Sequence, residues 1–417
     1  MELVNEQYVI GGVPVTDLVR QFDSPLYVYD GDKILSQYKR LRTAFADSRF
    51  VFKYALKANN NLNILRLLQS AGCGLDAVSI QEVHLGLRAG FPAHEILFTP
   101  NCVNIAEYEE AVRLGVRINI DNIRVLEEFG VLYGDKIPVC IRLNPHIVAG
   151  GHGNIKTGHI DSKFGISIHQ LRHILRVVRS GNLRVEGLHM HTGSDILDAE
   201  VFLTAAEVLF EAAEEFPDLQ FLDFGSGFKV AYREGDVVTD IEQLARRLTD
   251  RLQEFDRSYG RALQIWFEPG KFLVSESGHL LVRANTVKQT VSTVFVGVDS
   301  GLNHLIRPML YNAWHTIVNA TNPSGTTRLY SVVGYICETD TLGWDRKLTE
   351  VREGDILALL NAGAYGYSMS SNYNSRFRPA EVLVLGGKAH LIRKREKMED
   401  LLRNMVELPE LQAMERV

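Results

Sequence analysis

Short apolar runs alternate with amphipathic stretches between residues 50 and 268. The runs are rich in β-branched and aromatic residues, whereas the stretches after them repeat apolar residues at three- and four-residue spacing. The runs predict eight strands: Phe50–Leu56, Gly74–Val78, Ile96–Thr99, Arg117–Ile120, Pro138–Leu143, Val185–His191, Phe221–Phe224 and Gln264–Glu268. The stretches predict helices, among them Leu62–Ala71, Ser79–Ala89, Ile105–Leu114, His169–Ser180, Val201–Glu215 and Ile241–Tyr259.

The number of strand–helix units decides between two α/β architectures. An open, doubly wound sheet would show the same local alternation, but eight units over about 220 residues match the size of a (β/α)8 barrel. After about residue 270, strand-like segments follow one another without regular helices, which indicates a mainly β second domain. These segments are His279–Thr286, Val294–Val298, Arg328–Val333, Ile356–Leu360 and Ala380–Leu385, and Pro25–Tyr29 is a further strand that could join them. We therefore expect a TIM-type barrel over residues 31–270 and a β-rich domain made of residues 1–30 and 271–417.

Composition narrows the class of protein. Of the 417 residues, 46% are hydrophobic and 23% are charged, which is typical of a folded chain. The formal net charge of −6 argues against nucleic-acid binding, which requires a basic surface. The four cysteines form no C-x-x-C pair, which argues against a zinc ribbon or a disulfide framework. Because the sequence shows neither a secretory signal nor an apolar run of about 18 residues, we expect a cytoplasmic protein without a membrane span.

Candidate chemical residues follow the predicted strands, and a barrel of this kind forms its site at the carboxyl ends of its strands. Lys57 follows the first strand, where burial would lower the pKa of its amine and allow it to attack an aldehyde. A surface lysine is the plain alternative. His189 and His191 close the sixth strand and face one side of it. This spacing suits a metal pair, one histidine packed on a ligand ring, or two histidines satisfied in the core.

Two further segments follow the seventh and eighth strands. Gly225-Ser226-Gly227 would let backbone N–H groups approach a phosphate, although it lacks the third glycine of a dinucleotide fingerprint. Glu268 opens the segment Glu268-Pro269-Gly270-Lys271, where its carboxylate could hold a protonated ring nitrogen or simply belong to a turn.

The β-rich part of the sequence adds its own candidates. Arg307 and Tyr311 lie four residues apart and would share a helical face suited to gripping a carboxylate. Cys337 and Glu338 stand between strand-like segments, where a cysteine is most often a small core residue. The run from 363 to 374 is polar, small and aromatic, and is typical of the wall of a binding site.

Together the motifs resemble those of the diaminopimelate decarboxylases, which are pyridoxal-phosphate decarboxylases of the alanine racemase fold type. In order they read YALKANNN, GLDAVS, RLNPH, the run from Thr157 to Ile166, HMHTGS, LDFGSGF, EPGK, IRPMLY, CET and GAYGYSMSSNYNSRFRP. Each motif is weak alone, but their order and their barrel-like positions are specific. The resemblance implies a (β/α)8 barrel with a β domain, pyridoxal 5'-phosphate as cofactor and no metal. It also implies decarboxylation of meso-2,6-diaminopimelate to L-lysine, the last step of lysine biosynthesis.

The resemblance further implies roles for individual residues at the cofactor. Lys57 would be the Schiff-base lysine, Glu268 would pair with the pyridine nitrogen, and His191 would stack on the ring. Asp76 would organise the polar network of the site. The phosphate would be held by Ser194, Gly225, Ser226, Gly227 and Tyr365.

The implied substrate contacts come mainly from the β-rich domain. Arg307 and Tyr311 would bind the distal carboxylate, and Lys271 and Tyr365 are further candidates for contact with the substrate. Cys337 and Glu338 would reach into the neighbouring subunit's site of a homodimer. There Cys337 would donate a proton to the carbanion, and Glu338 would contact the distal amino group.

Three positions depart from the family pattern. Lys271 replaces an arginine that holds the distal carboxylate with two hydrogen bonds, and a lysine cannot reproduce that planar fork. Ser226 replaces a glycine of the phosphate loop, and Thr339 replaces the serine of the CES-type motif.

Because the first departure concerns the substrate, related substrates stay open, such as carboxynorspermidine or another basic amino acid. A remote alternative is a metal-dependent barrel hydrolase that uses His189 and His191. A non-catalytic homologue would be expected to lack Lys57 or Cys337, and both are present.

Overall fold

The computed structural model describes residues 1–147, 162–191, 193 and 199–412. The chain divides into two compact units. The barrel unit comprises residues 30–278 and 361–368, and the β unit comprises residues 1–29, 279–360 and 369–417. No helix in the described ranges is long and apolar enough to cross a membrane.

Eight parallel strands form the centre of the barrel unit. In spatial order they are β5 (Phe50–Ala55), β6 (Gly74–Ala77), β7 (Ile96–Phe98), β8 (Arg117–Ile120), β9 (Val139–Asn144), β11 (Val185–Met190), β12 (Phe221–Asp223) and β13 (Gln264–Phe267). Because β13 pairs with β5 and β8 pairs with β9, the sheet closes on itself. A short strand, β10 (Ile166–Ser167), pairs with β9. All eight predicted barrel strands are present, and the predicted fold class of a TIM-type barrel with a β domain is confirmed.

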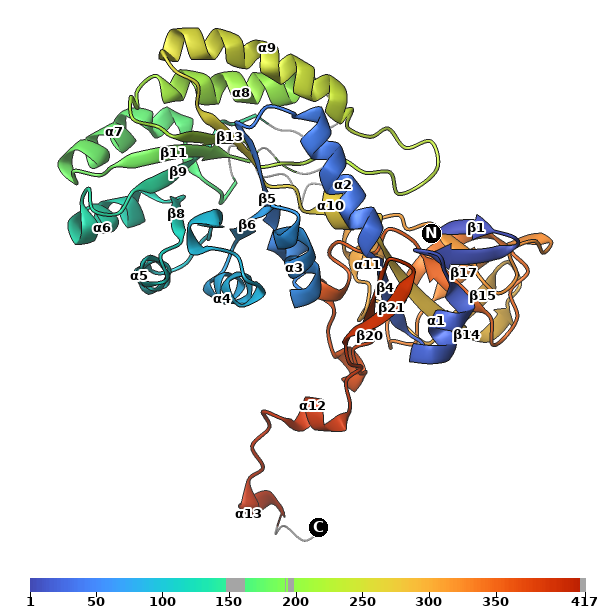
Figure 1. Ribbon diagram of the computed structural model, residues 1–417. Coiled ribbons are helices and arrows are strands. Elements are labelled where there is room, and N and C mark those ends of the chain that lie inside the picture. The colour runs from blue at the N-terminus through green and yellow to red at the C-terminus, as the bar shows by residue number, and fades with distance from the viewer. Residues whose placement is uncertain (148–161, 192, 194–198, 413–417) are drawn as a thin grey trace. The chain divides into compact units, whose positions relative to one another are not determined.

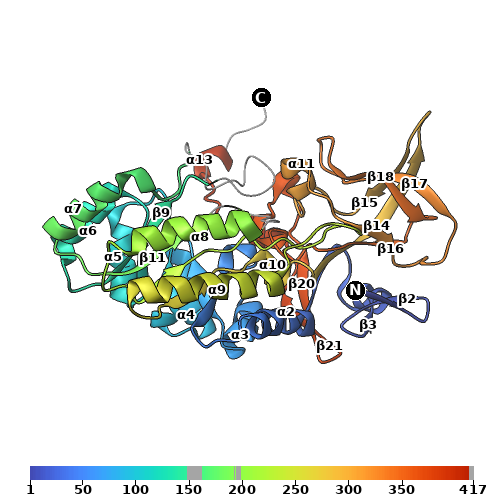
Figure 2. The ribbon, with the colours of Figure 1, turned by 90° about the horizontal axis from the view of Figure 1, so that it is seen from above.

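One helix precedes the first barrel strand, others follow the barrel strands, and they cover the barrel from outside (Figures 1 and 2). They are α2 (Gly31–Ala44), α3 (Leu62–Ser70), α4 (Ile80–Ala89), α5 (Ile105–Leu114), α6 (Ile123–Tyr133), α7 (Leu171–Ser180), α8 (Ala199–Ala213), α9 (Ile241–Tyr259) and the short α10 (Lys271–Val274). Ser79, Asn104 and Asp240 cap the first turns of α4, α5 and α9 by accepting a backbone N–H.

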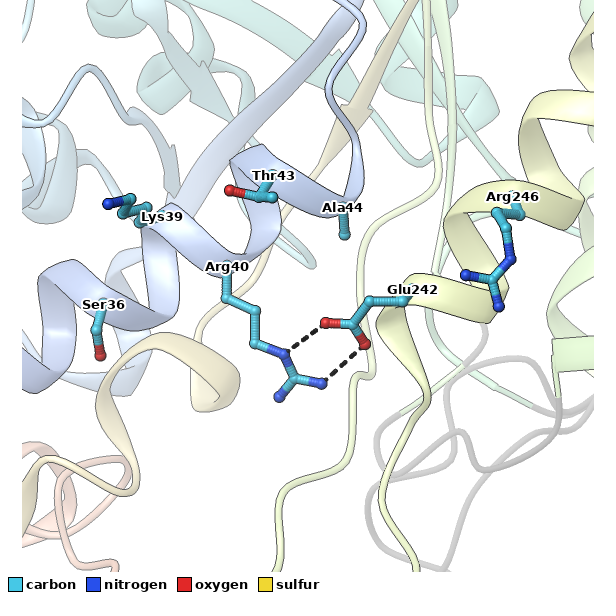
Figure 3. Close-up of a pocket in the computed structure, with 7 residues that line it drawn as sticks. All are labelled: Ser36, Lys39, Arg40, Thr43, Ala44, Glu242 and Arg246. Atoms are coloured by element: carbon cyan, nitrogen blue, oxygen red, sulfur yellow. Dashed lines mark hydrogen bonds and ion pairs between the residues drawn. The ribbon is translucent and has the colours of Figure 1, made fainter.

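The first and last long helices of the barrel unit are joined by an ion pair. Arg40 in α2 donates two hydrogen bonds, of 2.9 and 3.0 Å, to the carboxylate of Glu242 in α9. The pair crosses a surface pocket that is also lined by Ser36, Lys39, Thr43, Ala44 and Arg246 (Figure 3). Because both partners are nearly half exposed, we assign the pair a small contribution to stability.

Aromatic rings fill part of the barrel interior. The rings of Phe221 and Trp266 stack with their centroids 3.5 Å apart, and both pack with Leu97 and Cys140 in one buried cluster. Gly187 in β11 lies against this stack, because a Cβ atom at that position would come within 2.3 Å of the Phe221 ring. The interior of the barrel is therefore close-packed at this level rather than open.

The β unit is built on a mixed sheet of nine strands. Along the sheet run β18 (Thr341–Thr349), β17 (Thr327–Val333), β15 (Val294–Val298), β14 (Gly278–Gln289), β4 (Leu26–Asp30), β20 (Ala380–Leu385) and β21 (Lys388–Arg393). Two further strands, β19 (Ile356–Leu359) and β16 (Ile317–Asn319), extend it from β14. The six strands that the sequence predicts for this domain are all present.

The remaining elements of the β unit are short. At the N-terminus, β1 (Glu2–Val4), β2 (Gln7–Ile10) and β3 (Val13–Pro14) form a small antiparallel sheet, and α1 (Val15–Phe22) follows them. Three short helices come later in the chain: α11 (Arg307–Tyr311), α12 (Met398–Leu402) and α13 (Pro409–Gln412).

We predict that Gly187→Ala destabilises the barrel by about 1–3 kcal/mol, because the added methyl group overpacks the Phe221 ring. Chemical denaturation of the wild type and the variant measures this difference. The double variant Gly187→Ala/Phe221→Leu should recover part of the loss, since leucine is smaller than the ring that the methyl group meets. A double variant whose stability loss equals the sum of the two single losses would contradict this packing.

Candidate active site

One pocket of the barrel unit collects half of the candidate residues. It is lined by the polar side chains of Lys57, His191, Ser226, Glu268, Lys271 and Tyr365, together with Gly227 and the less polar Ala55, Phe228, Gly270 and Phe272. These residues follow β5, β11, β12 and β13, or belong to the segment 361–368. The pocket thus lies at the carboxyl ends of the strands, where barrels of this kind carry their chemistry.

Lys57 lies on a 3-10 turn directly after β5. Its Nζ is 3.3 Å from the Oδ2 of Asp76, which is fully buried at the end of the neighbouring strand β6. Burial disfavours the ammonium form, but the negative charges of Asp76, Tyr365 and Glu268 together outweigh burial and raise the pKa of Lys57. The lysine keeps 39% of its side-chain surface exposed. It is therefore a charged amine that a ligand in the pocket can reach.

Glu268 is a buried carboxylate with one hydrogen-bonded oxygen. Its side chain is 5% exposed, and its Oε2 lies 3.2 Å from the Nε2 of His189, which is fully buried. Burial would raise the pKa of Glu268, but His189 and then Lys57 outweigh burial and hold it at about 2. Among the described residues, Oε1 of Glu268 has no hydrogen-bond partner. The pocket therefore contains an ionised carboxylate with one oxygen available to a ligand.

Two further carboxyl groups lie near Glu268. Burial, reinforced by the charge of Glu268, raises the pKa of Asp76 and that of Asp223. His189, Asp223 and Glu268 offer ligand-type atoms that all lie within 4.8 Å of one another. In the part of the chain that the structure describes, His191 does not belong to this cluster.

The loop after β12 is shaped by its first glycine. Gly225 has a φ of +61°, and its N–H donates a hydrogen bond of 2.9 Å to Asp223. A Cβ atom on Gly225 would come within 2.5 Å of Nδ1 of His191, so a glycine is required for this close approach. The N–H of Ser226 points to the same Nδ1 at 3.4 Å. Burial lowers the pKa of His191 well below its usual value, so the ring is neutral and accepts this hydrogen bond.

Residues 361–368 belong to the barrel unit although the chain reaches them from the β unit. Their backbone is bound to the barrel by hydrogen bonds from Ala362 N–H to Gly278 and from Tyr365 N–H to Ala58, each 2.8 Å long. Tyr365 has a φ of +56°, which is uncommon for a residue with a side chain. With this φ and the hydrogen bond to Ala58, the side chain of Tyr365 lines the pocket.

In the β unit, Cys337 and Glu338 form a small cluster with two residues of the later polar run. Asn374 accepts a hydrogen bond of 3.0 Å from the N–H of Cys337 and donates one of 3.1 Å to its sulfur. The hydroxyl of Tyr373 donates to Glu338 at 3.0 Å, and this bond raises the pKa of Tyr373 to about 12. Cys337 is exposed, so its thiol is held by Asn374 and is open to solvent.

Arg307 and Tyr311 lie at the two ends of α11. The predicted short helix is present, Arg307 is buried with 7% of its surface exposed, and Tyr311 is half-buried. One helical turn separates the two side chains, as the four-residue spacing predicts.

One predicted phosphate contact lies outside the described residues, and three buried residues were not predicted as cofactor contacts. Ser194 lies outside the described residues. The family resemblance implies no cofactor contact for His189 or Asp223, and both lie beside Glu268. Arg142 was also not assigned, and it is buried with its guanidinium 4.8 Å from the centre of the Phe164 ring. Arg142 lies near the end of the fifth predicted strand, where a charged side chain is expected to be buried. Because a buried charge is costly unless it is paired, this position could have marked Arg142 as a candidate.

Known proteins resemble this chain along nearly its whole length. Residues 31–275 match the family of the pyridoxal-dependent decarboxylases, pyridoxal binding domain. The diaminopimelate decarboxylase of Methanothermobacter thermautotrophicus is 40% identical over 408 residues, which cover 95% of this chain and 94% of that protein.

Solved structures agree with this match. The structure of diaminopimelate decarboxylase from M. jannaschii with L-lysine is 31% identical, has a TM-score of 0.90 and covers 98% of both chains. The enzyme from Helicobacter pylori with L-lysine is 35% identical with a TM-score of 0.86, and the match covers 93% of this chain and 98% of that one. The chain therefore belongs to the diaminopimelate decarboxylase family of the pyridoxal-dependent decarboxylases.

Proposed function

We propose that this protein decarboxylates meso-2,6-diaminopimelate to L-lysine and CO2 with pyridoxal phosphate as its cofactor. The observation that carries the proposal is the pocket itself, in which a reachable lysine amine and an ionised buried carboxylate occupy the ends of neighbouring strands β5 and β13. The family's full-length relatives support the choice of substrate.

The residues of the pocket fit the cofactor. Oε1 of Glu268 is a buried acceptor without a partner in the described part of the chain, as required of a group that binds a protonated ring nitrogen. The loop Gly225–Gly227 places small residues where backbone N–H groups can approach a phosphate. The neutral ring of His191 borders the same pocket and offers a flat face for stacking.

We assign the cofactor contacts as follows. Lys57 would hold the cofactor covalently, Glu268 would keep the ring nitrogen protonated, and His191 would support the ring face. Ser226, Gly227 and the Tyr365 hydroxyl would hold the phosphate. When bound, pyridoxal phosphate supplies an aldehyde that joins the substrate amine and a cationic ring that accepts the electron pair left by CO2.

Lys57 also has a part in proton transfer. Its raised pKa means that the amine is protonated in the free pocket, with Asp76 as its partner. An ammonium cannot act as a nucleophile, so Lys57 must release a proton before it binds the cofactor aldehyde. The buried Asp76 lies within 3.3 Å of the amine and is positioned to receive that proton.

We propose a homodimer in which Cys337 donates a proton at the substrate's α-carbon and Glu338 contacts the distal amino group. Asn374 supports this role, because its two hydrogen bonds fix the thiol in an exposed position. Arg307 and Tyr311 would bind the distal carboxylate, with Lys271 in the pocket as an additional cation. We place the protein in the cytoplasm, which the four free cysteines support.

We predict that Lys57→Ala loses covalent attachment of the cofactor and lowers activity by about three orders of magnitude or more. Borohydride reduction followed by peptide mass analysis should show the reduced cofactor on the Lys57 peptide of the wild type only. Lys39→Ala, on the exposed face of α2, is the matched control and should be labelled at Lys57 like the wild type. Labelling of the Lys57→Ala protein would refute the assignment.

We predict that two inactive variants complement each other. Lys57→Ala and Cys337→Ala subunits, mixed and reassociated, should form heterodimers with about half of the wild-type activity, because one of two sites is then intact. Native mass spectrometry verifies the heterodimer. Inactive heterodimers would disprove a site shared between subunits, whereas each variant's own activity tests the residue roles separately.

We predict that Arg307→Met raises the KM for diaminopimelate by about tenfold and changes kcat less, since a lost carboxylate contact is worth about that factor. The function itself is tested by measuring CO2 release from diaminopimelate, lysine, ornithine and arginine side by side. Arg352→Met, on an exposed arginine, is the control. Preferred release from lysine or ornithine by the wild type would overturn the substrate assignment.

A further inference from the structure

The barrel register brings His189 to Glu268. His189 in β11 lies opposite Asp223 in β12, and Asp223 in turn lies opposite Trp266 in β13. Glu268 follows β13 by one residue, and its backbone N–H donates to the carbonyl oxygen of Gly225 at 2.7 Å. Three consecutive strands thus fix both ends of the contact between Nε2 of His189 and Oε2 of Glu268, which measures 3.2 Å.

The buried charge on Glu268 needs a permanent partner. An ionised carboxylate that is only 5% exposed is costly unless it is hydrogen-bonded or paired. Asp76 and Asp223 add further acidic groups around it and supply no positive charge. Lys57 is cationic in the free pocket, but its proposed role requires the amine to react with the cofactor and exchange with the substrate. His189 has no such reaction to undergo, so its contact with Glu268 need not break during the cycle.

The contact also selects one oxygen of Glu268. Oε2 is occupied by His189, which leaves Oε1 as the oxygen that a ligand can engage. We propose that His189 is a positioning residue for the decarboxylation, which holds Glu268 ionised and in one rotamer so that Oε1 meets the ring nitrogen of the cofactor. This inference rests on the proposed function, since it takes Glu268 as the partner of that nitrogen.

Two other roles of His189, core packing and metal binding, would have different experimental consequences. If His189 only filled space in the core, any polar residue of similar size could replace it without loss of cofactor binding or activity. A metal ligand would share an ion with Asp223 and Glu268, whose ligand-type atoms lie within 4.8 Å of those of His189. However, one oxygen of Asp223 already accepts a hydrogen bond from the N–H of Gly225, and one oxygen of Glu268 is already hydrogen-bonded to His189. These contacts argue against a shared metal ion.

Two amide variants separate these readings. The amide nitrogen of His189→Gln can occupy the place of Nε2 and donate to Glu268, whereas the shorter His189→Asn ends near the place of Nδ1. We expect His189→Gln to keep the wild-type dissociation constant for pyridoxal phosphate and the wild-type kcat within about threefold. His189→Asn should weaken cofactor binding and lower kcat by about tenfold each, with the KM for diaminopimelate changed less than about twofold. His84→Asn is the control, because His84 forms an exposed pair with Glu110 and should change neither constant.

Three results would overturn the inference: both amide variants equal to the wild type, both impaired alike, or a stoichiometric metal in the holoenzyme that His189→Asn loses. Thermal unfolding midpoints compare the folding of the two variants. The wild type separately tests the proposed function, because a protein that neither binds pyridoxal phosphate nor releases CO2 fails that proposal. The difference between the glutamine and asparagine variants tests the role of His189.

Discussion

The site depends on keeping the Glu268 carboxylate charged inside the barrel. Its side chain is 5% exposed and has two more buried carboxyl groups as neighbours, so burial and charge repulsion both oppose ionisation. His189 and Lys57 outweigh these costs and hold the pKa of Glu268 at about 2. Burial, and then the charge of Glu268, raises the pKa of Asp76 and that of Asp223. The barrel thus keeps the carboxylate of Glu268 negatively charged at the place where we assign the cofactor nitrogen.

The closed sheet explains how this arrangement is built. Parallel strands end at one rim, so Lys57 after β5, His189 in β11 and Glu268 after β13 meet although more than 200 residues separate the first from the last. Asp223 has a second structural use, because it fixes the Gly225 turn against His191. Asp223 therefore links the carboxylate of Glu268 with the loop assigned to the phosphate, and that loop lies against the ring assigned to stacking.

The sequence predicts the barrel well because its strands are buried apolar runs. It also identifies candidate residues directly after these strands, and several of them line the pocket. Strands of the β unit with exposed charged residues were missed: Thr341–Thr349 and Lys388–Arg393 lack an apolar run. The sequence also pairs His189 with His191 through their i, i+2 spacing. The contact of His189 with Glu268 was not predictable, because the predicted barrel makes β11, β12 and β13 neighbours but does not give the register between them. Likewise, the assignment of 361–368 to the barrel unit rests on hydrogen bonds to distant residues such as Ala58, which the sequence does not show.

The central claim is that Glu268 stays ionised in the folded protein. A carboxyl-labelled glutamate sample followed by 13C NMR, with Glu268→Gln to assign the resonance, measures this directly. Because the folded pKa lies far below the ordinary value, the Glu268 signal should remain that of a carboxylate, without a shift, between about pH 4 and pH 8. A titration of the assigned signal within that range, toward the protonated form as pH falls, would contradict the account.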